Sequence, residues 1–569
     1  MAPKTLDTDI LILGAGGAGL FAALHAHKAA PGLSITVAVK GLLGKCGCTR
    51  MVQGGYNVAL AREDSVERHF MDTIVGGAWL CDQELAWKLV VLAIERIKEL
   101  ENELGCFFDR NPDGTIHQKA FAGQTFDRTV HKGDLTGIEI INRLAEQVWA
   151  RKIGRLEEHR AVELVKSKDG SAIAGVLFID MRTGEYVFVR AKAVLLATGG
   201  GPTMYKYHTP SGDKSCDGLA MALRAGLPLR DMEMVQFHPT GLLAGTHTRM
   251  TGTVLEEGLR GAGGYLLNGE RERFMPRYDP KAERATRDLV SRAMFSELKK
   301  KPTPRGGLYL SMAHLGAERV AKEFKGMVER CADCGFDLAG GLVEVVPTAH
   351  YMMGGVEFAP DCTTELPGLF AAGEDSGGVH GANRLGGNGV ANSTVFGAVA
   401  GDAMAAWVKD QAPREPDRAA IDAAIAACES PFRKKPSTSL EAVREKLYDV
   451  MWEQVGIVRD AAGLQQAQAE LAALDSELDS SPVAHAERAF NLTWHDWLNL
   501  KSLVAVSKVI AAAAIARKDS RGAHYRSDFP EAGALEHSAF TSVKNMTVSM
   551  KPVRFTRVAP GQTLLRNVA

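Results

Sequence analysis

The order of apolar and polar positions predicts alternating strands and helices near the N-terminus of the chain. An apolar run at Ile10–Leu13 is followed by a glycine-rich turn, an Ala- and Leu-rich stretch at Leu20–Lys28 and a β-branched run at Ile35–Val39. This order of strand, turn, helix and strand is typical of a βαβ unit. The apolar spacing also predicts helices at Gln83–Leu104 and Thr136–Ala150. The chain therefore begins as an α/β fold.

The pattern changes in the middle of the chain and then returns. Strand-like runs alternate with turns over Leu156–Lys192, and a buried strand at Ala193–Leu196 leads into a second glycine-rich turn. Residues from about 240 to 345 form short, mixed, charged segments, as expected for an inserted cap. A short apolar strand at Gly368–Ala372 and a helix from near Asn392 to Val408 then resume the first fold.

Four parts follow from this organisation, and a length of 569 residues has room for three or four structural units. The chain is helix-rich after a proline-containing linker near residue 411, and its last stretch contains short strand-like runs. We expect a Rossmann-like domain at 1–240 and 346–410, an α+β capping domain at 241–345, a helical domain at 411–530 and a C-terminal segment at 531–569.

The composition of the chain disfavours some classes of binding partner. The 67 Lys and Arg residues balance 68 Asp and Glu residues, so no net field attracts nucleic acid or anionic lipid. The nine Cys residues lie in a chain too large to need disulfides, which favours reduced thiols and a cytoplasmic location. The N-terminus does not read as a signal peptide, and the longest apolar stretches fall short of about 20 residues. We therefore expect no nucleic acid partner and no membrane span in this chain.

The first glycine-rich turn, at residues 14–19, has the spacing of a dinucleotide-binding loop between a strand and a helix. Its glycines are expected at the tight turn, at the approach to a pyrophosphate and at the helix packing point. Lys40 stands where an acidic ribose ligand for NAD is expected, which argues against NAD. Two further strand-end turns, at Thr198-Gly199 and Gly373-Glu374, suit one extended cofactor. FAD fits this arrangement better than NAD.

A longer series of motifs resembles the flavoprotein subunit family of succinate dehydrogenase and fumarate reductase, which also contains L-aspartate oxidase. The motifs occur in the family's order across residues 10 to 530. They are Gln53-Gly54-Gly55, Asp134-Leu135-Thr136-Gly137, Asp217-Gly218 with Met221-Ala222-Leu223-Arg224-Ala225-Gly226, Gln236-Phe237-His238-Pro239-Thr240-Gly241, Glu257-Gly258-Leu259-Arg260-Gly261, Arg287-Asp288-Leu289-Val290-Ser291-Arg292, His350-Tyr351-Met352-Met353-Gly354-Gly355, His380-Gly381-Ala382-Asn383-Arg384-Leu385-Gly386 and Ser520-Arg521-Gly522-Ala523-His524.

The resemblance implies an FAD-binding domain, a capping domain that closes over the flavin and a helical domain behind them. It also implies a set of residues that contact FAD: Gly14, Gly16, Gly17, Gly19, Lys40, Gln53, Gly54, Gly55, Thr198, Gly199, Asp217, Glu374 and Asn388.

The same resemblance implies roles in catalysis. Reduction of a C=C bond beside a carboxylate needs a hydride from the flavin, a proton from the opposite face and cations near the carboxylate. By motif, His238, His350 and Arg384 would bind carboxylate oxygens, and Phe108 would pack against the substrate. Arg287 would transfer the proton, with Glu257 and Arg260 as relays. Taken singly, Arg287 and Arg384 could form surface ion pairs, and His238 and His350 could be satisfied core residues.

Three departures from the family pattern alter these expectations. Cys48 replaces the His to which FAD is covalently joined in succinate dehydrogenases, so noncovalent FAD is expected, with a thioether from Cys48 as the alternative. Glu256 replaces a Thr that binds the second carboxylate, and its charge would repel a dicarboxylate unless it turns away or is protonated. Gly389-Val390-Ala391 replaces a Ser-Leu-Leu type segment at the flavin.

Cys331 and Cys334 form a single CxxC and are interpreted as structural, so no metal site is expected.

The predicted function is interconversion of a saturated and an α,β-unsaturated carboxylic acid by an FAD-dependent oxidoreductase. One alternative is an oxidase of the L-aspartate type, in which Glu256 would face the substrate amine. Another is a flavoprotein subunit that transfers electrons within a complex and has no substrate chemistry of its own. The chain has no cysteine array for a cluster, so an iron-sulfur centre would belong to a partner subunit, which could hold the protein at the inner face of a membrane.

Overall fold

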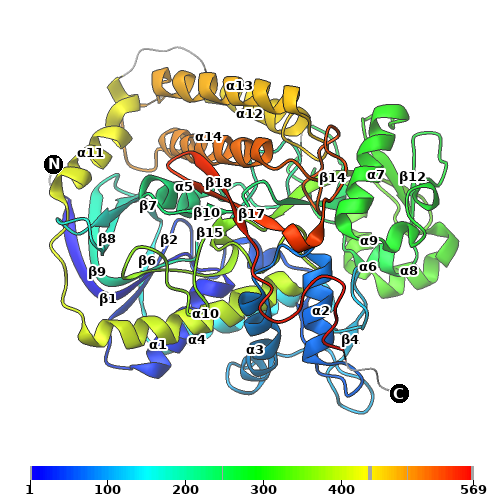
Figure 1. The fold of residues 1–569 in the computed structure, drawn as a ribbon, viewed down its shortest axis with the longest axis horizontal. Helices are drawn as coiled ribbons and strands as arrows, with labels where there is room; N and C mark the ends of the chain where they lie inside the picture. The colour runs from blue at the N-terminus through cyan, green and yellow to red at the C-terminus, as the bar shows by residue number, and fades with distance from the viewer. Residues whose placement is uncertain (1–2, 247, 434–438, 484, 566–569) are drawn as a thin grey trace.

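The computed structural model describes residues 3–246, 248–433, 439–483 and 485–565, and its largest sheet has seven strands. Six of them follow the order β6-β2-β1-β9-β8-β7, and β16 pairs with β9 (Figure 1). The strands are β1 (Lys4–Leu13), β2 (Ile35–Val39), β6 (Gly154–Glu157), β7 (His159–Lys166), β8 (Ile173–Asp180), β9 (Tyr186–Leu196) and β16 (Leu369–Ala371).

The parallel half of this sheet brings the glycine-rich turns together. β1 is parallel to β2 and β9, and β16 is parallel to the end of β9. The carboxyl ends of these strands therefore lie at one edge, where Gly14, Thr198 and Gly373 follow them. The expected strand Ala193–Leu196 is the end of the longer β9, whose first half pairs antiparallel with β8. The predicted Rossmann-like α/β fold is confirmed.

Two helices rich in Ala and Gly, α1 and α10, pack against this sheet. α1 and α10 pack closely, because Gly397 and Gly401 let α10 approach the backbone of α1 at Ala18 and Ala22. The expected helix from Asn392 begins four residues earlier, at Asn388, directly after Gly387 in the left-handed conformation (φ 88°). The helices are α1 (Gly17–Ala29), α2 (Val66–Gly76), α3 (Gln83–Asn102), α4 (Thr136–Ala150), α5 (Asp217–Arg224) and α10 (Asn388–Trp407).

The cap is built on a second, antiparallel sheet in the order β11-β14-β13-β12 and lies at one end of the molecule (Figure 1). Its elements are β11 (Val235–Leu242), α6 (Gly258–Gly261), β12 (Tyr265–Leu267), α7 (Arg287–Lys300), β13 (Leu308–Ser311), α8 (Ala317–Glu323), α9 (Lys325–Ala332) and β14 (Leu342–Met352). β11 and β14 cross the expected domain boundaries at residues 240 and 345. Where the domains divide stays a prediction.

A small three-stranded sheet joins the first domain to the cavity beneath the cap. Its order is β3-β5-β4, formed by Tyr56–Asn57, Thr129–Val130 and Gln118–Lys119. All pairs are antiparallel, and Lys119 lies opposite Thr129. This sheet places the side chains of β4 and β5 close to the cap residues.

Helices also dominate the region after residue 411: α11 (Arg418–Glu429), α12 (Leu440–Glu453), α13 (Ala461–Ser480) and α14 (Leu492–Ala516). By length and mean hydropathy α14 meets the criteria for a membrane-spanning helix, but it lies under α12 and α13 with most of its apolar side chains in the core (Figure 1). Core helices of this kind pass the same test.

The strand-like end of the chain folds back onto the middle of the molecule. β17 (Ala539–Lys544) and β18 (Thr547–Pro552) form a hairpin, and β17 also pairs with β10 (Leu229–Arg230), which pairs in turn with β15 (Gly355–Val356). The remainder of the expected C-terminal segment has no further strand up to residue 565. Residues 566–569 of that segment lie outside the described ranges.

Candidate active site

Two adjoining cavities lie at the carboxyl edge of the main sheet. The larger extends under the cap, and the smaller lies beside the end of β2. They share Gly16, Gly199 and Lys214 and so form one extended space. The expected site residues that line it are Gly14, Gly16, Gly17, Lys40, Gln53, Gly54, Gly55, Thr198, Gly199, Asp217, His238, Glu256, Glu257, Arg287, His350, Glu374 and Arg384.

The backbone of this space fits a long phosphate-containing cofactor. Gly14 has a φ of +111°, and a Cβ there would overlap the carbonyl oxygen of Ala197, so only glycine allows the turns after β1 and β9 to meet. The first residues of α1 and α10, including Gly17 and Gly389, line the larger cavity. Helix N-termini present unpaired N–H groups that bind anionic groups. Gly16, Gly17 and Gly199 would hold the pyrophosphate of FAD.

An ionised carboxylate marks the smaller cavity. Asp217 accepts hydrogen bonds from Lys40 (2.9 Å) and Arg160 (2.8 Å). Burial alone would raise the pKa of Asp217, but the cations of Arg160 and Lys40 lower it below its ordinary value. Asp217 therefore stays charged and would accept from the ribose hydroxyls of a dinucleotide.

Two residues expected to contact FAD lie elsewhere. The amide oxygen of Asn388 accepts from Asn57 (2.8 Å) and contacts His69 Nε2 (3.0 Å), and its nitrogen donates to Thr73 (3.1 Å). Its side chain thus joins α10 to β3 and α2 and does not line either cavity. Gly19 packs against the carbonyl of Gly14 inside the turn and is also absent from the lining. Both serve the packing of the cofactor domain.

Arg384 is a buried cation that forms no ion pair within the described ranges of the chain. Its Nη2 donates to Gln236 (3.1 Å), its guanidinium lies 4.3 Å from the centre of the Tyr351 ring, and its Nε has no partner. Burial and the nearby Arg287 lower the pKa of Arg384 to about 10. A buried guanidinium without a carboxylate partner favours an anionic ligand in the cavity.

His238 and His350 lie beside the two arginines, with ring centres 5.4 Å apart. His238 Nδ1 accepts from the backbone N–H of Thr240 (3.3 Å), so its Nε2 carries the proton. His350 Nδ1 contacts the hydroxyl of Thr209 (2.8 Å). Burial and the charge of Arg287 hold the pKa of both rings well below the ordinary value. Both are therefore neutral at pH 7.

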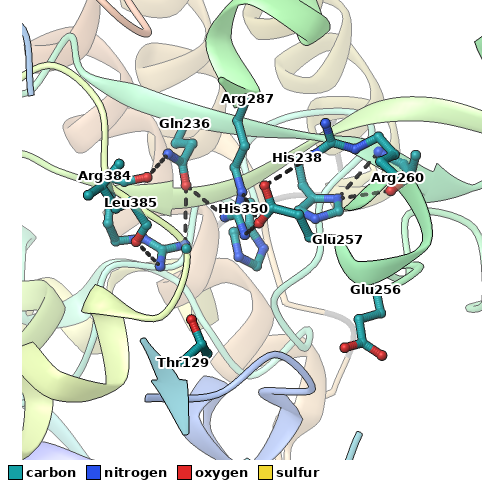
Figure 2. A network of polar contacts seen from close by, with 12 residues as sticks. Thr129, Gln236, His238, Glu256, Glu257, Arg260, Arg287, His350, Arg384 and Leu385 are labelled. Carbon is teal, nitrogen blue, oxygen red and sulfur yellow. Dashed lines mark hydrogen bonds and ion pairs between the residues drawn. The ribbon is translucent and has the colours of Figure 1, made fainter. Parts of the chain in front are cut away.

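Arg287, Glu257 and Arg260 form a buried charged chain beside these histidines (Figure 2). Glu257 Oε2 accepts from Arg287 Nε (3.1 Å) and Nη2 (2.6 Å), and Glu257 Oε1 accepts from Arg260 (3.2 Å). Burial would raise the pKa of Glu257, but Arg287 and Arg260 lower it. Arg287 and Glu257 line the cavity, whereas Arg260 lies behind Glu257 and donates to the carbonyl of Glu283 (2.7 Å).

Gln236 belongs to the quoted motifs, but its position between the two arginines was not predicted. Its amide oxygen accepts from Arg287 (3.0 Å) and Arg384 (3.1 Å), and its nitrogen donates to Asn383 (2.8 Å) (Figure 2). The motif Gln236-Phe237-His238 places it on the same strand as His238, two residues away. Alternation along β11 was therefore the signal that both side chains point to one face.

One residue that was expected to contact the substrate lies outside the cavity. Phe108 is 3% exposed, belongs to the apolar core under α3 and α4, and does not line the cavity. It follows the end of α3, and its side chain is drawn into that core by the hydrophobic effect. Phe121 supplies the aromatic wall of the cavity instead.

Glu256 lines the cavity, but its charge is not isolated. It forms an ion pair with Lys119 of β4, and its side chain points away from the pair formed by Glu257 and Arg287 (Figure 2). Burial raises the pKa of Glu256, although Lys119 opposes this shift. Glu256 thus turns away and is paired with Lys119, which is the condition under which it was not expected to repel a dicarboxylate. Its effect on the range of substrates stays a prediction.

Cys48 lines the larger cavity and is free. Burial raises the pKa of its thiol to about 12, despite the nearby ammonium of Lys214. The thiol is therefore neutral at pH 7 and a weak nucleophile. In the replaced family segment, Gly389 and Val390 line the same cavity. Cys331 and Cys334 lie at the end of α9, and the described ranges hold no group of three His, Cys, Asp or Glu side chains arranged for a metal ion.

Comparisons with known proteins agree with this geometry. A family described as "FAD binding domain" matches residues 9–390, and one described as "Fumarate reductase flavoprotein C-term" matches residues 444–564. One subunit of the CoM/CoB fumarate reductase of Methanothermobacter marburgensis is 40% identical over 537 residues, covering 93% of this chain and 96% of that protein. A structure of the Escherichia coli quinol fumarate reductase has a TM-score of 0.92 at 32% identity and covers 98% of this chain and 99% of that one. Mycobacterium smegmatis Sdh1 has a TM-score of 0.87 at 35% identity, covering 97% and 95%.

The glycine-lined cofactor space and the cap above it define an FAD-dependent oxidoreductase. Within that class, the chain belongs to the flavoprotein subunit family of succinate dehydrogenase and fumarate reductase. The predicted family and the predicted enzyme class, an oxidoreductase acting on carbon-carbon single bonds, are confirmed.

Proposed function

We propose that this chain interconverts fumarate and succinate in the cavity between the cofactor domain and the cap. The observation that carries the proposal is the buried, unpaired guanidinium of Arg384 beside the ion-paired guanidinium of Arg287. One arginine is free to bind an anion, and the other is already joined to a carboxylate that can exchange protons with it. This division of charge suits a reaction that needs both a bound carboxylate and a proton donor.

Binding of the first substrate carboxylate is assigned to Arg384, His350 and His238. The guanidinium of Arg384 supplies the charge, and its position on the ring face of Tyr351 limits its movement. The proton on His238 Nε2 supplies a neutral donor, because Nδ1 is already used as an acceptor. Neutral donors and one cation can hold a carboxylate and stabilise the charge that develops on it.

Proton transfer is assigned to Arg287, with Glu257 and Arg260 behind it. Bound FAD supplies the hydride chemistry of the reaction. Arg287 would give a proton from its guanidinium to the substrate carbon, and Glu257, 2.6 Å from Nη2, would then pass on to Arg287 a proton delivered through Arg260. Arg260 bonds the other carboxylate oxygen of Glu257 and lowers the pKa of that carboxylate.

We propose that FAD is held without a covalent bond. A thioether requires the thiolate of Cys48 as nucleophile, and the raised pKa of this partly buried thiol disfavours the thiolate at neutral pH. Lys40 and Asp217 would hold the ribose end, and Gln53, Gly54, Gly55 and Glu374 would line the flavin end.

Electron transfer is proposed to involve an iron-sulfur partner subunit, because the described chain holds no cluster ligands of its own. Such a partner would place this chain on the cytoplasmic face of a membrane without a span of its own. The named relatives include a quinol fumarate reductase, which supports this arrangement.

The two other candidate functions are less well supported. An L-aspartate type oxidase was expected to use Glu256 for the substrate amine, but that carboxylate is already bonded to Lys119. A purely electron-transferring subunit does not need Arg287, Arg384, His238 and His350 around one cavity.

The test is an anaerobic titration of the flavin in the purified holoenzyme. Dithionite-reduced protein is mixed with fumarate, crotonate and iminosuccinate, and oxidised protein with succinate and L-aspartate. We expect fumarate to restore the oxidised flavin spectrum and succinate to bleach it, whereas aspartate does neither. Bleaching by aspartate followed by recovery in air would favour the oxidase, and no response to any acid would favour an electron-transferring subunit.

A further inference from the structure

This inference rests on the proposed function and concerns the second acidic group of the substrate. We propose that Lys119 is a specificity-determining residue that keeps the Glu256 side of the cavity electrically neutral and so allows a dicarboxylate to bind. The two residues come from different parts of the fold. Lys119 is the last residue of β4, and Glu256 precedes α6 in the cap.

Glu256 is placed where its charge would act on a ligand. It lines the cavity together with Glu257, its side chain is buried, and its backbone N–H contacts the sulfur of Met327 (3.5 Å). Met327 lies on α9, so this contact holds the backbone of Glu256 within the cap. Arg287 is committed to Glu257 and cannot also neutralise Glu256. Without another cation, the Glu256 carboxylate would face the ligand unneutralised.

Lys119 supplies that cation. Its Nζ bonds Glu256 Oε1 and lies 5.7 Å from the centre of the Phe121 ring, which forms part of the cavity wall. Its side chain is 20% exposed, so the ammonium is only partly hydrated. Burial lowers the pKa of His131 to about 4, and the charge of Lys119 contributes to this shift. At this partial exposure, solvent screens the charge of Lys119 only in part.

The pair therefore has a specific electrostatic consequence. With both residues present, the Glu256 carboxylate at this end of the cavity is neutralised by the ammonium of Lys119, which bonds it from β4. Removal of Lys119 leaves a carboxylate that repels a second substrate carboxylate, whereas removal of the Glu256 charge leaves an ammonium that attracts it. A pair that served only to hold the cap on the cofactor domain would affect charged and neutral ligands alike.

Fumarate and its monoamide, fumaramate, provide matched ligands, because they differ mainly in the charge of one end. Binding is measured in oxidised holoenzyme from the shift of the flavin absorption spectrum, so that no turnover occurs. For Lys119→Met we expect the dissociation constant of fumarate to rise roughly 10- to 100-fold and that of fumaramate less than about threefold. For Glu256→Gln we expect tighter binding of fumarate by roughly three- to tenfold and little change for fumaramate.

Two control variants distinguish an effect of charge on binding from an effect of misfolding. Lys132→Met removes another lysine, 45% exposed and paired with Asp109 (3.4 Å) outside the cavity lining, and should leave both dissociation constants unchanged. The double variant Lys119→Met/Glu256→Gln should bind fumarate within about threefold of the wild type. If Lys119→Met does not fold, Lys119→Gln, which keeps a polar group without the charge, replaces it.

The proposal is overturned if Lys119→Met weakens fumarate and fumaramate equally, or if both single variants change fumarate binding in the same direction. Those results, with a wild type that binds and reduces fumarate, would leave the proposed function intact. A wild type that neither binds nor reduces fumarate would contradict the proposed function and this inference together.

Discussion

Arg287 and Arg384 donate to the same atom, the amide oxygen of Gln236, at 3.0 and 3.1 Å. The proposed proton donor and the proposed carboxylate-binding group are therefore held at a fixed spacing by one neutral side chain. Gln236 is in turn fixed by its own donation to Asn383 (2.8 Å) and to the carbonyl of Arg384 (2.7 Å). The two like charges remain close, which contributes to the lowered pKa of Arg384.

Replacement of Gln236 tests this shared contact. Gln236→Leu is expected to retain FAD but to lower kcat/KM by about 10- to 100-fold, because two buried guanidinium donors lose an acceptor and each loss costs about 1–3 kcal/mol. Both KM and kcat should change, since one arginine binds and the other transfers the proton. Steady-state kinetics with flavin content as the reference would measure this. Unchanged kcat in Gln236→Leu would show that Arg287 is positioned by Glu257 alone.

Replacement of Arg287 separates chemistry from cofactor binding. Arg287→Gln should lower the single-turnover rate of flavin oxidation by fumarate by about 100- to 10,000-fold, because a positioned proton donor is lost. Flavin occupancy and reduction by dithionite should stay normal, because Arg287 is carried by α7 in the cap, apart from the glycine-rich turns.

Arg292 provides a matched control for this variant. It lies on the same helix, donates to the carbonyl of Gly522 (2.8 Å) and does not line the cavity. Arg292→Gln should therefore keep a near wild-type single-turnover rate. If the two variants behaved in the opposite way, the proton-donor role would move from Arg287 to Arg292.

Local patterns in the sequence were sufficient for most of the fold. Ile35–Val39 and Thr136–Ala150 have the predicted bounds, because period-2 and period-3.6 spacing directly reflect which face is buried. The start of α10 was placed too late, since Gly387, Gly389 and the polar Asn388 weaken a helical pattern. The left-handed conformation of Gly387 that begins this helix depends on tertiary contacts.

The site residues that belong to the quoted motifs could be predicted from the sequence. His238, His350, Arg287 and Arg384 do line one cavity, as the resemblance implied. Lys119 was not predicted, because its partner Glu256 is 137 residues away and only the folded cap brings the two together. Phe108 was misassigned for a related reason: sequence adjacency does not tell whether an apolar ring faces a core or a cavity.

The linkage of FAD can be tested by acid precipitation. All of the FAD should be released into the supernatant, because the Cys48 thiol, with its pKa raised to about 12, is not a thiolate at neutral pH. Cys48→Ser should release the same fraction. Yellow colour and fluorescence that remain with the denatured wild type and disappear in Cys48→Ser would instead establish a thioether.

A buried histidine outside the active site makes stability depend on pH. Burial, with help from Arg160 and Lys40, lowers the pKa of His495 to about 3, and neither ring nitrogen has a hydrogen-bond partner. The unfolded chain protonates this ring near its ordinary pKa of about 6.5. Between pH 6.5 and 3 the unfolded state therefore binds a proton that the folded state does not, and stability falls as the pH falls.

The variant His495→Leu removes this proton and keeps a similar volume. From pH 7.5 to pH 5, the free energy of unfolding should fall by about 2 kcal/mol less in the variant than in the wild type. This difference follows from about 1.4 kcal/mol per pH unit over the interval below pH 6.5. Urea unfolding at both pH values with saturating FAD would measure the difference. His537→Leu, at an exposed histidine, should match the wild-type pH dependence. If His495→Leu and His537→Leu gave the same pH dependence as the wild type, His495 would be protonated in the folded protein, and the chain would have to supply an acceptor for its ring.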